Sequence, residues 1–484
     1  MFKRPAALLF ACSTLALAAC ALEASEPNAP TNETAITFEA ASGDTAEAQR
    51  GFLMVPENRS DPESRMIRLE YVRFPATGET AGAPIVYLAG GPGGSGINTA
   101  QGPRFPLFMA MREFGDVIAF DQRGTGASND LPTCRSSQVD PDDEPLSDEE
   151  YAARHRLAAD ECLAYWNNEG VDIFGYTTLE SARDLDALRQ HLGSKQISLW
   201  GISYGSHLAL AAAKELDGKI DRMVLASVEG LDQTVKLPSR TNAYFDRLQA
   251  AINTQPDMAA IGDIKALMRR VFAKLDAEPI MLNVPLASGG SAPFLLERRD
   301  LQQFTSGMIA DPQYALLAVQ LYAQLDAGET GFLSQLLSRF IEPGAPISFR
   351  PMSFAMDIAS GTGAARLNQV QTEAETSLLK DYLNFPMPHL DGQVPGLDLG
   401  DDFRKAPVSD VPLLVLSGTL DGRTYLESQR EAVSGFANAQ FVTIENAGHN
   451  LFMVSPEVTQ TIQAFMRGDT LPSDTIVVDL PTGP

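Results

Sequence analysis

Three side chains have the types and the order needed for nucleophilic catalysis: Ser203, Asp421 and His449. Ser203 is the centre of Gly201-Ile202-Ser203-Tyr204-Gly205, between an apolar run and an alanine-rich run. A serine hydroxyl is a poor nucleophile until a histidine takes its proton, and an aspartate must hold that histidine in the correct tautomer. The chain therefore has the residues for acyl transfer through a covalent serine intermediate.

The acid and the base each have a competitor in the sequence. His207 is the histidine nearest to Ser203, but it falls one turn into the expected helix after the serine, and we interpret it as structural. Asp410 precedes the strand-like run 411–416, whereas Asp421 follows it. Because the acid of such a triad follows its strand, Asp421 and His449 are the predicted partners of Ser203.

Acyl transfer also requires N–H donors where negative charge develops on the substrate oxygen. One predicted donor is the backbone N–H of Tyr204, directly after the nucleophile. The other is expected in the glycine-rich run 89–96. Pro92 has no N–H, so Gly91 is the preferred donor. Phosphate binding by this run is disfavoured, because the lysine of a phosphate-binding loop is missing.

The triad and the oxyanion donors can meet only if the strands that precede them have their carboxyl ends at the same edge of one sheet. Short apolar runs typical of buried parallel strands occur at 84–88, 116–120, 197–200, 222–226, 411–416 and 440–444. Helical patterns such as 178–192 alternate with them, which predicts an α/β fold with a mostly parallel, doubly wound sheet. In a strand–turn–helix this tight only glycine fits on either side of Ser203, so the hydroxyl should project at the sheet's carboxyl edge.

The alternation stops at residue 231 and resumes near 408. Six stretches between these points look helical: 241–252, 261–275, 300–309, 312–327, 331–340 and 365–383. We therefore expect a helical cap over residues 231–407. The α/β core would consist of residues 46–230 and 408–470, with a C-terminal tail at 471–484.

The N-terminus has the pattern of an export signal. Lys3 and Arg4 precede an apolar run too short for a mature membrane anchor, and Leu17-Ala18-Ala19-Cys20 matches a bacterial lipobox. We expect residues 1–19 to be removed, Cys20 to be lipidated and residues 20–45 to form a flexible tether. The alternative is an ordinary secretory signal. Lipidation would place the protein in the cell envelope, on the periplasmic side of the outer membrane if the source is Gram-negative.

The number of cysteines and the net charge indicate which covalent bonds and which binding partners to expect. Once the signal is removed and Cys20 is acylated, Cys134 and Cys162 remain, and a disulfide between them is expected in an exported protein. The formal net charge of −25 argues against nucleic acid as a partner. No Cys/His spacing suggests a metal site, and no cofactor is expected.

Several motifs together resemble the proline iminopeptidase and tripeptidyl aminopeptidase group of α/β-hydrolases. They are Gly90-Gly91-Pro92-Gly93-Gly94, Asp121-Gln122-Arg123-Gly124-Thr125-Gly126-Ala127-Ser128, the serine pentapeptide, and the turns that carry Asp421 and His449. The resemblance covers roughly residues 52–229 and 411–466 and implies an α/β-hydrolase fold. It also implies release of N-terminal residues from short peptides through the acyl-enzyme.

The same resemblance implies acidic residues under the cap that hold the substrate's free α-ammonium. Glu229 and Asp357 are the candidates, each with the alternative of being an ordinary surface or helix-cap carboxylate. Ala89 stands where many members have histidine, and the segment around Asp357 lacks a cysteine that some relatives have. Arg123 is interpreted as structural, pairing with a carboxylate below the site.

Two other functions use the same sequence features. A carboxylesterase would use the same triad and oxyanion donors, because these groups do not distinguish an ester from an amide. A non-catalytic envelope lipoprotein would keep the fold for binding alone, and the complete triad argues against it.

Overall fold

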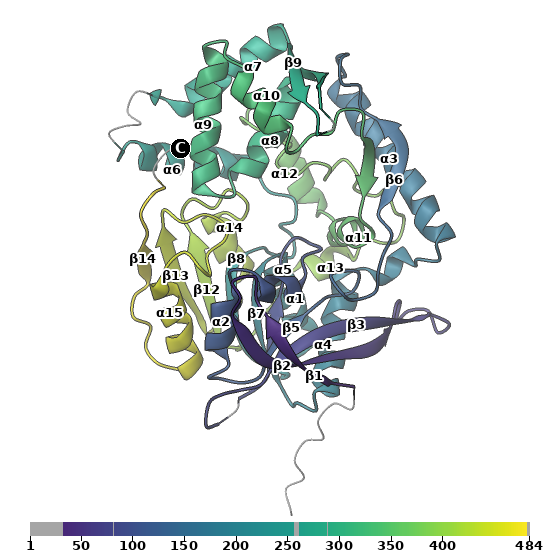
Figure 1. The fold of residues 1–484 in the computed structure, drawn as a ribbon, viewed down its shortest axis with the longest axis vertical. Helices are drawn as coiled ribbons and strands as arrows, with labels where there is room; N and C mark the ends of the chain where they lie inside the picture. The colour runs from purple at the N-terminus through teal and green to yellow at the C-terminus, as the bar shows by residue number, and fades with distance from the viewer. Residues whose placement is uncertain (1–31, 81, 256–260, 288, 482–484) are drawn as a thin grey trace, which may run out of the picture.

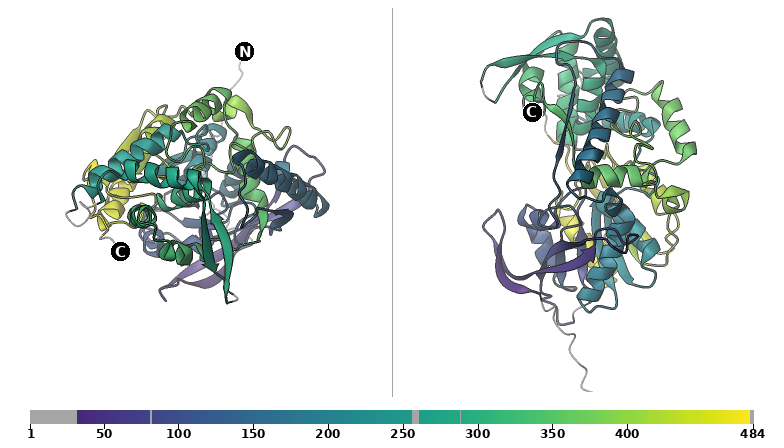
Figure 2. Two further views of the ribbon diagram at one scale, coloured as in Figure 1. Left: turned by 90° about the horizontal axis from the view of Figure 1, so that it is seen from above. Right: turned by 90° about the vertical axis from the view of Figure 1, so that its right-hand side faces the viewer.

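The computed structural model describes residues 32–80, 82–255, 261–287 and 289–481 (Figure 1). The expected signal peptide and Cys20 lie outside the described residues. Figure 1 shows a strand-rich lower half and a helical upper half. The side view of Figure 2 shows the helical half lying over the sheet half.

Ten strands form one sheet within the described residues. The first three strands are antiparallel to their neighbours, and all pairs from β5 to β14 are parallel. In spatial order they are β1 (Thr34–Glu39), β2 (Thr45–Pro56), β3 (Met66–Phe74), β5 (Val117–Phe120), β4 (Ile85–Leu88), β7 (Ile197–Ser203), β8 (Ile220–Val228), β12 (Leu413–Gly418), β13 (Ala439–Glu445) and β14 (Thr475–Val477).

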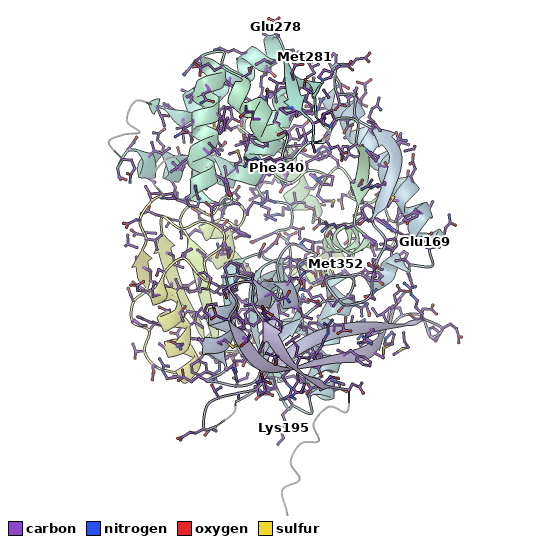
Figure 3. The ribbon with its side chains drawn as sticks, in the orientation of Figure 1. Glu169, Lys195, Glu278, Met281, Phe340 and Met352 are labelled. Carbon is purple, nitrogen blue, oxygen red and sulfur yellow. A yellow bond between two sulfur atoms is a disulfide. The ribbon has the colours of Figure 1, made fainter. Side chains whose placement is uncertain are left out.

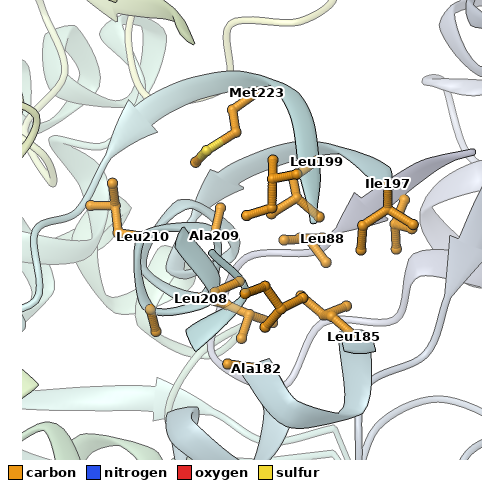
Figure 4. Close-up of a cluster of buried hydrophobic side chains, with 14 of the residues drawn as sticks. Leu88, Ala182, Leu185, Ile197, Leu199, Leu208, Ala209, Leu210 and Met223 are labelled. Atoms are coloured by element: carbon orange, nitrogen blue, oxygen red, sulfur yellow. The ribbon is translucent and has the colours of Figure 1, made fainter. Parts of the chain in front are cut away.

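Helices cover both faces of this sheet, which explains why its central strands are apolar without alternation. Along β7, Ile197 and Leu199 face one hydrophobic cluster, whereas Trp200 and Ile202 face the other. Figure 4 shows the first cluster, where strand leucines meet Leu185 and Leu208. The helices on that face are α4 (Thr178–His191), α5 (Tyr204–Glu215) and α14 (Leu426–Ala432), and those on the other are α1 (Gly96–Gln101), α2 (Phe105–Met111) and α15 (Pro456–Arg467).

The cap has two lobes, each with its own hydrophobic cluster. The first lobe contains α6 (Pro238–Ile252), α7 (Ile264–Ala277), the hairpin of β9 (Ile280–Pro285) and β10 (Ser291–Leu296), α8 (Arg298–Met308), α9 (Pro312–Asp326) and α10 (Gly331–Leu337). The second contains β6 (Cys134–Val139), α3 (Asp148–Asn168), η1 (Ile173–Gly175), β11 (Pro346–Phe349), α11 (Pro351–Ser360) and α12 (Ala364–Ala374). The short helix α13 (Gly400–Arg404) packs its Phe403 against the core cluster.

The second lobe joins segments from both sides of the nucleophile. Strand β6 pairs antiparallel with β11, so part of the expected first core segment belongs to the cap. The predicted disulfide is confirmed: Cys134 and Cys162 are bonded and fasten β6 to α3. Met352 of α11, labelled in Figure 3, is buried in the core cluster that contains α5, the helix that follows the turn (or elbow) at Ser203 and is called here the elbow helix. Helix α11 therefore rests directly on the α/β core.

The α/β architecture is confirmed, and further expected boundaries differ. Residues 34–39 form β1 inside the expected tether 20–45, and residues 475–477 form β14 inside the expected tail 471–484. The cap includes β9, β10 and β11, and the helix expected at 365–383 ends at Ala374. Among the described residues, no helix combines the length and apolar character needed to cross a bilayer.

Candidate active site

Ser203 lies at the junction of β7 and α5, in a tight turn with a glycine two residues away on each side. Its φ of 56° and ψ of −130° are rare for a residue with a side chain, and such conformations concentrate at functional sites. A Cβ at Gly205 would lie 2.0 Å from the Leu88 carbonyl oxygen, and one at Gly201 would lie 2.8 Å from the Gly205 carbonyl oxygen. The close packing therefore requires both glycines and presents Ser203 at the start of the elbow helix.

Asp421 and His449 follow neighbouring parallel strands, β12 and β13, and meet at the same edge of the sheet. His449 Nδ1 lies 3.0 Å from Asp421 Oδ2 and 3.1 Å from Oδ1. The Asp421 carboxylate is fully buried and accepts hydrogen bonds from the Thr424 hydroxyl and from the Arg423 and Thr424 N–H groups.

These contacts control the charge of Asp421. Burial alone would raise the pKa of its carboxyl group, but His449 and the Thr424 hydrogen bonds hold that pKa below its ordinary value. The ionised carboxylate can therefore orient the imidazole and stabilise it when it becomes charged. Because Nδ1 is engaged with Asp421, Nε2 is the nitrogen left to exchange a proton with a nucleophile.

The structure brings Ser203 and His449 together in one cavity of about 620 Å³ between core and cap. Among the hydrogen bonds of the described chain, none joins Ser203 Oγ to His449. Catalytic hydrogen bonds are often long before substrate binds and shorten in the complex. The structure thus places Ser203 and the Asp421-bound His449 at one cavity.

The predicted oxyanion donors line the same cavity. A Cβ on Gly90 would lie 3.0 Å from Ser203 Cβ and 3.6 Å from Ser203 Oγ, so the Gly90–Gly91 loop packs against the nucleophile. Gly91 has a φ of 129°, a conformation that favours glycine. Tyr204 begins α5, and the first N–H groups of a helix have no partner inside it. Both N–H groups are therefore candidates for binding an oxyanion beside Ser203.

The residues interpreted as structural are occupied by buried partners. His207 is fully buried, and its ring nitrogens lie 3.1 Å from the Gly230 carbonyl oxygen and from Ser360 Oγ. Arg123 is also fully buried and donates two 2.7 Å hydrogen bonds to Asp184. Neither side chain lines the cavity of Ser203, so both anchor the scaffold below it.

The two candidates for amine binding both line the cavity but differ in their partners. Glu229 is buried and forms a 2.5 Å ion pair with Lys236. Burial would raise the pKa of Glu229, but Lys236 and His207 hold it below its ordinary value. Glu229 is therefore a charged group whose charge is already compensated, which the sequence did not reveal.

Asp357 differs from Glu229 because no lysine or arginine of the described chain forms an ion pair with it. The carboxyl group forms no salt bridge within the described chain, and burial together with the nearby Glu229 raises its pKa to about 7. A cation brought beside it would favour its ionised form. Asp357 is therefore the cavity carboxylate with a charge still to be compensated.

Sequence reasoning missed the cations of this cavity. Arg104, Lys236 and Arg423 all line it, yet they come from the α1–α2 connection, the first residues of the cap and the turn after Asp421. Only Arg423 had a usable signal, its position two residues after the predicted acid. A second cavity of about 490 Å³ adjoins the first and shares Asp357 and residues 385–387 with it. Among the described residues, no group of three potential ligands could hold a metal ion.

Comparison with known families supports this fold. A family model described as alpha/beta hydrolase fold matches residues 83–279, and one described as TAP-like protein matches residues 400–477. The two matches contain Ser203 and the Asp421–His449 pair respectively. The chain thus has the α/β-hydrolase fold, with a C-terminal segment similar to TAP-like proteins.

Curated relatives are similar over part of their length. The chain is 30% identical over 261 residues to tripeptidyl aminopeptidase of Streptomyces coelicolor, covering 47% of this chain and 45% of the relative. It is 34% identical over 188 residues to serine protease Hip1 of Mycobacterium tuberculosis (36% and 35% covered). It is 31% identical over 232 residues to carboxylesterase B of M. tuberculosis (42% of each). The matches thus span less than half of each relative.

Proposed function

We propose that this protein is a serine hydrolase that removes short fragments from the free N-terminus of peptides. The observation that carries the proposal is the cavity that Ser203 shares with His449, whose imidazole contacts Asp421, with the uncompensated carboxyl group of Asp357 in the cavity wall. The similarity to tripeptidyl aminopeptidase and to serine protease Hip1 supports the same reaction class.

In the proposed reaction, Ser203 Oγ attacks the scissile carbonyl carbon while His449 Nε2 takes the hydroxyl proton. The N–H groups of Gly91 and Tyr204 stabilise the oxyanion, and Asp421 stabilises the imidazolium. His449 then gives the proton to the leaving amine, the C–N bond breaks, and an acyl-enzyme remains on Ser203. Water, activated by His449, hydrolyses the ester and restores the serine.

Selectivity for a free N-terminus would come from Asp357. A substrate α-ammonium beside this carboxyl group would provide the positive charge that it lacks, in a partly desolvated cavity where charge pairing is stronger than in water. Glu229 is the weaker candidate, because Lys236 already compensates its charge. A cavity of about 620 Å³ accommodates more than one residue, which favours release of short peptides over release of proline alone.

The test compares peptidyl anilides that carry a free or an acetylated N-terminus, with full-length protein and with Ser203→Ala. We expect the free substrates to be hydrolysed much faster, and Ser203→Ala to abolish both turnover and labelling by a fluorophosphonate probe. Equal turnover of free and acetylated substrates would contradict the aminopeptidase proposal. Wild-type protein inert to the probe would instead support the non-catalytic binding function.

A carboxylesterase is the second candidate, favoured by the similarity to carboxylesterase B. It predicts that simple aryl esters are hydrolysed with a higher kcat/KM than any free-amine peptidyl anilide. A positional library of N-terminal peptides, run alongside the esters, would decide between the two activities and identify the preferred fragment.

We also propose that the protein is anchored in the cell envelope through lipid on Cys20, facing the periplasm from the outer membrane if the source is Gram-negative. The proposal is supported by the lipobox pattern at residues 17–20. Cys20→Ser should move the protein from the membrane fraction to the released fraction. Persistent membrane association of this variant would contradict anchoring at Cys20.

A further inference from the structure

Arg104 holds a guanidinium group at the wall of the Ser203 cavity. It is the N-cap residue of α2, and neutral groups fix its position. It donates hydrogen bonds to the Tyr87 hydroxyl and, over 2.5 Å, to Asn450 Oδ1. Its guanidinium carbon lies 5.1 Å from the centre of the Phe452 ring. The side chain is thus positioned without any charged partner.

The charge of Arg104 is uncompensated within the described chain. None of its nitrogens lies within 4.0 Å of a carboxylate oxygen of residues 32–80, 82–255, 261–287 or 289–481, whereas Lys236 in the same cavity is paired with Glu229. The protein has 62 acidic and 37 basic residues, so carboxylates are abundant elsewhere. A guanidinium has five N–H donors and stays charged at any physiological pH. Described residues engage two of these donors, which leaves three for a ligand.

The position of Arg104 relative to the triad indicates which part of a substrate it meets. Asn450, which holds the guanidinium, directly follows His449. In acyl transfer the histidine gives its proton to the leaving nitrogen, so the leaving fragment must pass the loop that carries His449. Asp357 lies on α11, in the cap. Arg423, the other arginine of the cavity, donates to the carbonyl oxygens of Ser306 and Leu383, so its side chain lies against the cap.

We propose that Arg104 binds the C-terminal carboxylate of the leaving fragment, so that this protein acts on short peptides whose two charged ends are both recognised. The inference rests on the proposed peptidase function and adds the requirement for a free carboxylate. A peptide C-terminus is ionised at neutral pH, and its planar carboxylate matches the fork of a guanidinium. Asp357 would hold the ammonium end and Arg104 the carboxylate end, with Ser203 between them.

The experiment measures kcat/KM for alanine peptides of three to six residues, each prepared as a free acid and as a C-terminal amide, by mass spectrometry of the products. For the length that reaches Arg104, we expect the acid to be favoured about tenfold in wild-type protein, the ratio that one charge-assisted hydrogen bond in a partly exposed site provides. Arg104→Gln should reduce this ratio to about one while turnover of the amide changes little.

Two further variants separate carboxylate binding from support of the His449 loop. Arg104→Lys keeps the charge and should retain part of the preference. Arg112→Gln alters an arginine at the other end of α2 that donates to the Pro75 carbonyl oxygen and does not line the cavity, and it should keep the full preference. The rate of fluorophosphonate labelling reports the reactivity of Ser203 without any substrate carboxylate, and it should be equal in Arg104→Gln and wild type.

Each alternative outcome has a distinct meaning. If wild-type protein cleaves acids and amides equally at every length, or if the preference persists in Arg104→Gln, Arg104 does not bind the carboxylate. If Arg104→Gln loses labelling together with all turnover, its role is to support the triad. If no unblocked peptide is cleaved in either form, the proposed peptidase function fails as well.

Discussion

Asp357→Asn is the substitution that most directly tests how this site selects its substrate. Asparagine keeps the shape of the side chain and removes its charge. A charged hydrogen bond contributes roughly 1.5–3 kcal/mol, so the variant should lose about 10- to 100-fold in kcat/KM for peptides with a free N-terminus. Acetylated substrates never had the ammonium partner, and their slow turnover should remain unchanged.

The pKa of Asp357, about 7, adds a second signature. As the pH falls below 7 the carboxyl group becomes protonated, so wild-type kcat/KM for free-amine peptides should fall by up to about tenfold per pH unit from this group alone. In Asp357→Asn, kcat/KM should not show this decrease below pH 7. Fluorophosphonate labelling reports any titration of Ser203 reactivity itself, so dividing the peptide profile by the labelling profile isolates the contribution of Asp357.

Asp357→Asn should lower kcat/KM for free-amine peptides but raise the free energy of unfolding. The pKa of Asp357 is raised in the folded protein, so between pH 4 and 7 the folded state binds a proton that the unfolded chain releases. Raising the pH through this window therefore destabilises the fold, and the cost is fully present above pH 7. Asp357→Asn avoids it and should be more stable than wild type at pH 8, on the order of 2 kcal/mol, with the difference vanishing near pH 4.

Urea denaturation at the two pH values measures this difference, and peptide kinetics measure the loss of selectivity. Asp410→Asn is the matched control, because Asp410 is exposed and lies outside the cavity. Unchanged discrimination between free and acetylated peptides in Asp357→Asn would refute the role of Asp357 in amine binding. A variant less stable than wild type at pH 8 would refute the assignment of an uncompensated charge to Asp357.

Three other substitutions test the scaffold of the site. Asp421→Asn should lower kcat by roughly 10³- to 10⁴-fold, because the His449 tautomer is no longer held; near-normal turnover would exclude this triad. Replacing Cys134 and Cys162 together by serine should lower the free energy of unfolding by about 3–4 kcal/mol, the chain-entropy value for a bridge spanning 28 residues, and urea denaturation measures it. Gly205→Ala should yield little folded protein, since its Cβ would lie 2.0 Å from the Leu88 carbonyl oxygen; normal expression and labelling would contradict the packing of the elbow.

Much of the core was predictable because its signals are local. A buried parallel strand is a short apolar run, and the turn around Ser203 requires glycine on both sides whatever surrounds it. The strands β1 and β14 were missed because an edge strand needs few apolar residues: β1 buries only Phe38, and β14 only Ile476. Composition alone therefore made both segments look like tether and tail.

The sequence alone determined the order of Ser203, Asp421 and His449 along the chain, their positions at strand ends, and the cysteine pair. Each of these features depends on residue type and on neighbours close in the chain. Tertiary structure decided which charges meet. The pairing of Glu229 with Lys236, the isolation of Asp357 and the contact of Arg104 with Asn450, 346 residues away, follow from how cap and core pack. Whether two charges compensate each other depends on their distance in space, and the spacing of residues along the chain does not give this distance. The charged groups that line the cavity of Ser203 could therefore be identified only from the tertiary structure.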